Sequence, residues 1–194
     1  MSFLKLLTYS VVAFMVGGIP FSYIITKFAS NKDIRNIGSG NPGATNVVRA
    51  LNVWYGILVL ILDIAKGAIF VYYAKQYHNP VLVPVIAISL VLGHDFSPYL
   101  KFKGGKGVAT SLGIFLILSP VPIIIVSLIF LLCTTLFKFV SFGSIMASIS
   151  YPVISYFLGY RDNLLLAVIL GLLIIIRHKD NLKRLWYGQE KKSI

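Results

Sequence analysis

Apolar residues gather into seven long stretches along the 194-residue chain, and short polar segments separate them. A straight crossing of a bilayer takes roughly 20 apolar residues, and several stretches are shorter than that. The pattern predicts an all-α polytopic membrane protein with about seven transmembrane helices, one or two of them short. The 108–118 stretch could instead be a half-helix or a re-entrant piece, which makes five full crossings the competing topology. The stretches lie at about 3–28, 53–74, 81–97, 108–118, 121–137, 142–158 and 163–176.

The composition agrees with this pattern, because 57% of the residues are hydrophobic and the mean hydropathy is +0.85. We expect a single integral membrane domain over residues 1–194. Met1–Gly18 has a lysine before an apolar core, as a signal peptide does, but equally apolar segments follow, so we expect it to be the first span. Cys133, the single cysteine, lies within the apolar run Ile123–Phe137. An intrachain disulfide and a cysteine metal cluster are therefore excluded.

The basic residues predict the orientation of the chain in the membrane. The net charge is +12, and the lysines and arginines sit mostly at the ends of apolar stretches. If the N-terminus is outside, 14 of the 18 fall on the inner side, and Lys5, Lys75 and Arg161 stay outside. We therefore expect the N-terminus outside and the C-terminus in the cytoplasm. Nucleic acid is not an expected partner, because no basic helix or aromatic-basic module is present.

The first polar segment on the predicted inner side contains a loop suited to phosphate. Its glycines can bring backbone N–H groups together, its hydroxyl and amide side chains offer hydrogen bonds, and its arginine carries a permanent charge. The alternative is an ordinary turn and helix cap, since Asn-Pro-Gly is a good turn former. The candidate residues are Gly38, Ser39, Gly40, Asn41, Gly43, Thr45, Asn46 and Arg49.

The second polar segment places glycines around a lysine at the start of a predicted helix near Val108. Free N–H groups, the helix dipole and an ammonium group would then converge on one anion. Walker A would need a serine or threonine directly after the lysine, so ATP hydrolysis is not expected. The alternative is a positive-inside lysine cluster with a flexible turn. The candidate residues are Lys103, Gly104, Gly105, Lys106 and Gly107.

The third polar segment carries His178 and Asn181, which share one face of a continuing helix. Histidine can donate or accept near neutral pH, and asparagine can orient a substrate. The alternative is a basic helix end anchored at the interface by a tryptophan. Ser141 and Ser144, near an inner-side turn, could add hydroxyl groups to the same site.

Asp63 and Lys66 are charged residues within an otherwise apolar span. Their i,i+3 spacing lets them neutralise each other, so we expect a structural ion pair rather than a catalytic role. The carboxylates of the chain are too few and too scattered for a metal site.

These segments together closely resemble the three motifs of the bacterial membrane glycerol-3-phosphate acyltransferases that use acyl-phosphate as donor, the PlsY family. The matching stretches are Gly38–Asn46 with Arg49, Gly93–His94 leading to Phe102–Thr110, and Arg177 through Asn181 to Glu190. The stretch Leu62–Gly67 is also similar to that family. Asp95 and Ser97–Tyr99 vary the spacer after His94.

The resemblance implies a seven-helix enzyme of the bacterial inner membrane, with its active site facing the cytoplasm. It would make lysophosphatidic acid and inorganic phosphate from acyl-phosphate and glycerol 3-phosphate, without a cofactor and as a monomer in membrane lipid. By motif, Ser39 and Arg49 would be essential, and Lys103 and Lys106 with their glycines would hold phosphate. His178 and Asn181 would act from the third segment, and Glu190 would be structural.

The chemistry of the residues agrees with an activated donor. In this sequence no histidine is followed five residues later by an aspartate, so the dyad of acyl-CoA acyltransferases has no counterpart. We expect direct attack by the glycerol hydroxyl on the acyl carbonyl, with the proton passing to the donor phosphate or to His178. The main rival is a secondary transporter of an anion, and a weaker one is an interaction protein that binds anionic lipid.

Overall fold

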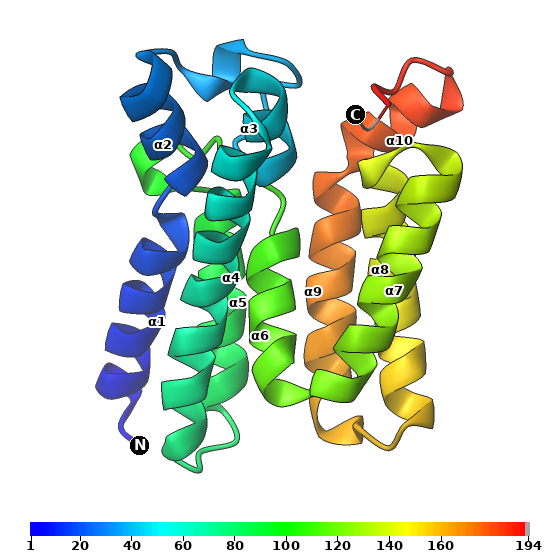
Figure 1. The fold of residues 1–194 in the computed structure, drawn as a ribbon. Helices are drawn as coiled ribbons and strands as arrows, with labels where there is room; N and C mark the ends of the chain where they lie inside the picture. Colours follow the sequence, from blue (N-terminus) through cyan, green and yellow to red (C-terminus); the bar gives the residue numbers. More distant parts are fainter. Residues whose placement is uncertain (193–194) are drawn as a thin grey trace. The chain divides into compact units, whose positions relative to one another are not determined.

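The computed structural model describes residues 1–192, which contain helices, turns and loops but no strand (Figure 1). Three short 3₁₀ turns lie at Ile34–Asn36, Pro98–Leu100 and Arg161–Asn163. The α-helices of the described part are α1 (Phe3–Gly18), α2 (Phe21–Ser30), α3 (Ala44–Ala50), α4 (Val53–Gln76), α5 (Leu82–Asp95), α6 (Val108–Leu118), α7 (Pro120–Phe137), α8 (Val140–Phe157), α9 (Leu164–Arg177) and α10 (Lys179–Trp186).

The helices confirm the predicted all-α membrane fold. Each of the seven apolar stretches is helical, and within residues 1–192 five helical segments are long and apolar enough to cross a membrane. The other two are short, since α6 has 11 residues and α9 has 14. At about 1.5 Å per residue, α6 is only about 16 Å long, roughly half of the hydrocarbon thickness. The number of full crossings and the orientation of the termini stay predictions.

The chain forms two compact units, one from Met1 to Ile117 and one from Leu118 onward. The first contains α1 to α6, and the second contains α7 to α10. We call them unit 1 and unit 2. The prediction of a single membrane domain over 1–194 stays a prediction.

Glycines allow the helices of unit 1 to pack closely. A Cβ atom on Gly17 of α1 would collide with the Leu90 carbonyl of α5, and one on Gly93 would collide with the Phe14 carbonyl. A Cβ on Gly113 of α6 would likewise collide with the backbone of α4. Small residues at such crossings are typical of membrane helices, because dispersion contacts rather than hydrophobic burial hold them together.

The segment between α2 and α3, which carries the first candidate loop, lies at the end of unit 1 opposite Met1 (Figure 1). Ile34, Val47 and Val59 are fully buried there and form one small core. Asn52 caps α4 by accepting hydrogen bonds from the N–H groups of Trp54 and Tyr55. This packing holds the connection between α2 and α4, which carries the first candidate loop.

In unit 2, α8 packs against both α7 and α9. The hydroxyl groups of Ser119 and Tyr151 form a buried hydrogen bond within this unit. Gly171 of α9 lies close to the Ser148 carbonyl of α8. His178 ends α9 and precedes α10, so α10 starts directly where the apolar helix stops.

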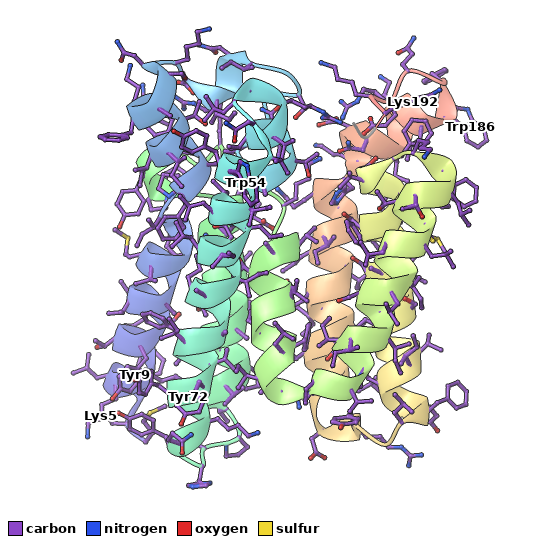
Figure 2. The ribbon with its side chains drawn as sticks, viewed as in Figure 1. Lys5, Tyr9, Trp54, Tyr72, Trp186 and Lys192 are labelled. Atoms are coloured by element: carbon purple, nitrogen blue, oxygen red, sulfur yellow. The ribbon has the colours of Figure 1, made fainter. Side chains whose placement is uncertain are left out.

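Aromatic and basic side chains mark the ends of the helices. Figure 2 shows Lys5, Tyr9 and Tyr72 at the end of unit 1 where the chain begins. In unit 2, Trp186 of α10 is 86% exposed. Tyrosine and tryptophan at helix ends are typical of the membrane–water interface.

Candidate active site

The first loop, Gly38–Gly43, is held in place by the side chain of Asn46. Its Nδ2 donates to the carbonyl oxygens of Ile34 (3.2 Å) and Ile37 (2.9 Å), and its Oδ1 accepts from the Ser39 N–H (2.9 Å). The side chain is only 2% exposed. We predicted Asn46 as a substrate ligand, but its amide protons and its oxygen already hold the loop backbone. Its position is therefore that of a residue that orients Ser39.

Ser39 and Arg49 both lie next to this arrangement. Ser39 is exposed, and its hydroxyl accepts from the Asn41 N–H at 3.4 Å. Arg49, in the last turn of α3, passes beside the loop, because its Cδ lies 3.9 Å from the place of a Cβ on Gly38. Gly38 has φ +59°, a left-handed conformation that favours glycine. The predicted serine and arginine are thus neighbours of one glycine turn.

Arg35, in the same segment, has a different task. Its guanidinium binds Asp33 through both carboxylate oxygens, with the shortest distance 2.6 Å, and lies over the ring of Tyr23. The hydrogen bond from Arg35 holds the pKa of Asp33 below its ordinary value of 3.8. The charge of Arg35 is therefore matched within the loop.

The second loop, Lys101–Gly107, is joined to the end of α5 by backbone hydrogen bonds. The N–H of Gly104 donates to the Asp95 carbonyl (3.2 Å), and the N–H of Gly105 donates to the His94 carbonyl (2.9 Å). The end of α5 therefore accepts both of these N–H groups, and the predicted substrate contacts of Gly104 and Gly105 stay predictions. Packing explains why both positions are glycines. A Cβ on Gly105 would collide with the His94 ring, and one on Gly104 would collide with the His94 carbonyl.

The start of α6 remains the candidate anion site of this loop. Gly107 has φ +73° and leads into α6, whose first-turn N–H groups have no acceptor within the helix. Lys106, directly before it, is half-buried, and Lys103 is exposed. The fully buried Asp95 lies close by, with Oδ1 3.2 Å from the place of a Cβ on Gly107.

The expected ion pair between Asp63 and Lys66 has a third member. Lys66 Nζ lies 2.7 Å from Asp63 Oδ1 and 2.9 Å from His94 Nδ1, and it also donates to the Ile19 carbonyl at 3.4 Å. The side chains of Asp63 and Lys66 are 4% and 3% exposed, and that of His94 is 10% exposed. The pair is therefore buried, as a charge pair inside a membrane helix is expected to be.

A small cavity lies beside this trio in unit 1. Its volume is about 170 Å³, including space open to solvent. The connection Gly18–Pro20, Pro42 of the first loop, His94 and Gly104–Gly105 of the second loop all line it. Unit 1 therefore brings both glycine loops to one place.

In unit 2, Glu190 organises the end that carries α10. Glu190 Oε1 accepts from Asn181 Nδ2 (2.6 Å) and from the Ser141 hydroxyl (2.9 Å), and Oε2 accepts from Arg184 Nε (2.7 Å). Burial opposes ionisation of Glu190, but these hydrogen bonds outweigh it and hold its pKa below the ordinary 4.5. The expected structural role of Glu190 fits this geometry. Ser141, predicted to bind substrate, donates to Glu190.

His178 is buried and has a defined ring orientation. Its Nδ1 lies 2.8 Å from the Ile174 carbonyl oxygen, which can only accept, so Nδ1 carries the proton in this contact. In the neutral ring the lone pair is then on Nε2. Ser144, the other predicted hydroxyl ligand, donates to the Val140 carbonyl of its own helix at 2.9 Å.

A model of the family described as glycerol-3-phosphate acyltransferase matches residues 7–188 of this chain. The chain belongs to this family. A glycerol-3-phosphate acyltransferase of Endomicrobium trichonymphae is 45% identical over 186 residues, with 95% of this chain and 94% of that protein covered. One of Thermotoga petrophila is 42% identical over 185 residues, with coverage of 95% and 94%.

Solved structures of the family share this fold. The crystal structure of PlsY (YgiH), an integral membrane glycerol 3-phosphate acyltransferase, matches in its glycerol 3-phosphate form with a TM-score of 0.91 and 38% identity. The match covers 97% of this chain and 95% of that one. Its lysophosphatidic acid form matches with a TM-score of 0.89 and 37% identity. This protein is therefore a multi-pass membrane acyltransferase.

Three residues of this acyltransferase around the candidate groups escaped the sequence reasoning. From the sequence alone, His94 has no assigned role within the second motif, Asp95 is a variation of the spacer, and Arg184 is one of several basic residues. The sequence held one signal, since the polar residues His94 and Asp95 close an apolar helix a few residues before the second loop. It did not show that the His94 ring turns toward Lys66, because that contact joins residues 28 positions apart.

Proposed function

We propose that the acyltransferase takes its acyl group from an acyl-phosphate and transfers it to glycerol 3-phosphate, giving lysophosphatidic acid and inorganic phosphate. The observation that carries the donor assignment is the environment of His178. Its Nδ1 donates to the Ile174 carbonyl, a neutral acceptor, whereas in acyl-transfer dyads this ring nitrogen donates to a carboxylate that makes histidine a stronger base. A weakly activated hydroxyl calls for a donor with a good leaving group, and phosphate is one.

The family and the solved relatives support the acceptor and the product. Those relatives are glycerol 3-phosphate and lysophosphatidic acid forms of a membrane acyltransferase, and they are 38% and 37% identical to this chain. The ligands themselves belong to those proteins. We infer the same acceptor here because the first and second loops present arginine, lysine and hydroxyl groups suited to phosphate.

In unit 1, we assign phosphate binding to Ser39, Arg49, Lys103 and Lys106. Arg49 can bind two phosphate oxygens at once, while Lys106 adds a point charge next to the first-turn N–H groups of α6. Gly38 and Gly40 give the first loop its left-handed turns. Asn46 contributes by orienting the Ser39 backbone.

In unit 2, we propose that Asn181 and His178 contact a substrate. Glu190 fixes the Asn181 amide through a 2.6 Å hydrogen bond, and the Ile174 carbonyl fixes the His178 ring. A substrate group bound by these side chains would meet donors and acceptors that are already oriented. Such preorganisation lowers a barrier without a covalent intermediate.

The reaction we propose is one direct transfer. The glycerol hydroxyl oxygen attacks the acyl carbonyl carbon, the bond between that carbon and the phosphate oxygen breaks, and the hydroxyl proton passes to the released phosphate. Charge on the leaving phosphate is balanced by the cationic side chains, so no base with a carboxylate partner is needed. We place the reaction at the cytoplasmic face of the bacterial inner membrane, the face to which the distribution of lysines and arginines assigns the three polar segments.

The purified protein should form lysophosphatidic acid from acyl-phosphate and labelled glycerol 3-phosphate, and should form none from acyl-CoA. Thin-layer chromatography of the labelled lipid measures this. Product from acyl-CoA alone would overturn the donor. No product from either donor, together with labelled glycerol 3-phosphate accumulating inside proteoliposomes, would favour a transporter.

Changing His178 to asparagine should lower turnover by less than about tenfold, because an obligatory general base contributes roughly 10²- to 10⁴-fold. The asparagine amide keeps a donor near the place of Nδ1 but cannot take a proton at neutral pH. Initial rates at saturating concentrations of both substrates give the comparison. A loss of about 10²-fold or more would assign the proton to His178 instead of the phosphate.

A further inference from the structure

Three polar residues are buried together in unit 1 outside the groups assigned above. Asp63 and Lys66 come from α4, and His94 comes from the end of α5. Their side chains are between 3% and 10% exposed. Burying charges inside a membrane protein is costly, and such residues usually serve function or a specific contact.

The contacts fix which atoms donate. The Lys66 ammonium has only donors, so His94 Nδ1, 2.9 Å away, accepts from it. The proton of the neutral ring is then on Nε2. Asp63 Oδ1, 2.7 Å from Lys66 Nζ and 3.6 Å from His94 Nδ1, matches the lysine charge. Lys66 therefore links the aspartate to the histidine ring.

The other edge of the ring faces the second glycine loop. His94 Nε2 occupies the space that a Cβ on Gly105 would take. The backbone of the same histidine accepts the Gly105 N–H at 2.9 Å, and the next carbonyl, of Asp95, accepts the Gly104 N–H at 3.2 Å. His94 thus contacts the loop through its ring and through its backbone, one residue before Lys106.

We propose that Asp63, Lys66 and His94 are positioning residues, which press the His94 ring against Gly105 and so hold Lys106 and the start of α6 in their phosphate-binding arrangement. This inference rests on the proposed function. It explains why residue 105 is a glycine, because the absence of a side chain makes room for the His94 ring and not for a phosphate oxygen. It also gives the Asp63–Lys66 ion pair a second role besides charge neutralisation, which is to hold the His94 ring in place.

A double-variant cycle tests this directly. Gly105→Ala places a methyl group against the His94 ring, and we expect the KM for a phosphate substrate to rise by about tenfold or more, because such overlap must displace the loop. His94→Asn keeps an oxygen near the place of Nδ1 for Lys66 but removes the ring that holds the loop, so its own KM should also rise, by about threefold or more. An unchanged KM in His94→Asn would overturn the positioning role. The KM is measured separately for acyl-phosphate and glycerol 3-phosphate.

The double variant Gly105→Ala with His94→Asn should recover, with a KM at least about threefold below that of Gly105→Ala alone. Recovery would show that the ring is what excludes a side chain at 105. A double variant whose KM is as high as or higher than that of Gly105→Ala would overturn the proposal, since the glycine would then be needed for another reason. Should Gly105→Ala fail to fold, the same suppression is measured as the recovered yield of monodisperse protein in detergent.

The wild-type protein separates this outcome from the proposed function. If it forms no lysophosphatidic acid from acyl-phosphate, the proposed function fails before the variants are compared. If it is active and the double variant does not recover, only the positioning role fails.

Discussion

Replacing Arg49 with alanine should lower kcat/KM for glycerol 3-phosphate by about 10²- to 10³-fold, because truncating one partner of a buried charge contact costs roughly 2–5 kcal/mol and 1.4 kcal/mol is tenfold. Arg49 lies beside Gly38 in the last turn of α3 and is half-buried. The fold should survive, since Ile34, Val47 and Val59 form the local core without it. Initial rates of labelled product formation measure the change.

Lys32→Ala is the matched control for charge, because Lys32 is an exposed lysine of the same segment. It should keep kcat/KM within about twofold of the wild type, as an exposed charge is screened by solvent and salt. Arg49→Lys keeps the charge and loses the two-pronged contact, so it should fall between the two. Equal activity of Arg49→Ala and Lys32→Ala would remove Arg49 from the phosphate site.

Replacing Lys106 with methionine should have an effect of similar size, about 10²-fold or more on kcat/KM, because the ammonium acts next to the first turn of α6 in a half-buried place. Methionine keeps much of the length of the lysine side chain, so the packing of its aliphatic part should be unchanged. The concentrations of acyl-phosphate and of glycerol 3-phosphate are varied in separate series. The substrate whose KM rises is the one whose phosphate the lysine binds.

Lys101→Met is the control for this variant, since Lys101 is exposed and lies in the same loop. It should change either KM by less than about twofold. Two variants with equal losses would mean that the loop contributes only its general positive charge, as the lysine-cluster alternative predicts.

Much of the fold could be predicted from hydrophobicity, because apolar side chains and satisfied backbone groups are what a bilayer demands. All seven stretches are helices, and the shortness of 108–118 appears in the structure as the 11-residue α6. The division into two compact units was not visible, since it follows from contacts between distant helices and not from a composition shift. That the protein works as a monomer also stays a prediction.

The site shows where sequence reasoning stops. The types of residue suited to phosphate were read correctly as a family signal, and the family match bears this out. The contacts of each group were not predictable from spacing. The Asn46 side chain and the Gly105 N–H both form hydrogen bonds with backbone carbonyl oxygens. A polar side chain in a motif can bind a ligand, or it can hold the loop that binds the ligand. Only the three-dimensional structure distinguishes these two roles. The substrate roles of the remaining candidates are still proposals.

Asp63 and Lys66 illustrate the same limit from within a helix. Their spacing predicted a pair, and the pair forms at 2.7 Å. The third partner, His94, comes from another helix, and helix register alone does not reveal such a contact. The sequence therefore indicated a structural pair where the structure shows a link to the second loop.

The most direct test of the account follows the oxygen atom that bridges the acyl and phosphate groups. The purified protein is given acyl-phosphate carrying ¹⁸O at that position, with unlabelled glycerol 3-phosphate, and both products are analysed by mass spectrometry. Direct attack on the acyl carbonyl predicts one inorganic phosphate per lysophosphatidic acid, with the label entirely in the phosphate. Unlabelled inorganic phosphate, or labelled phosphate released without lysophosphatidic acid, would contradict it.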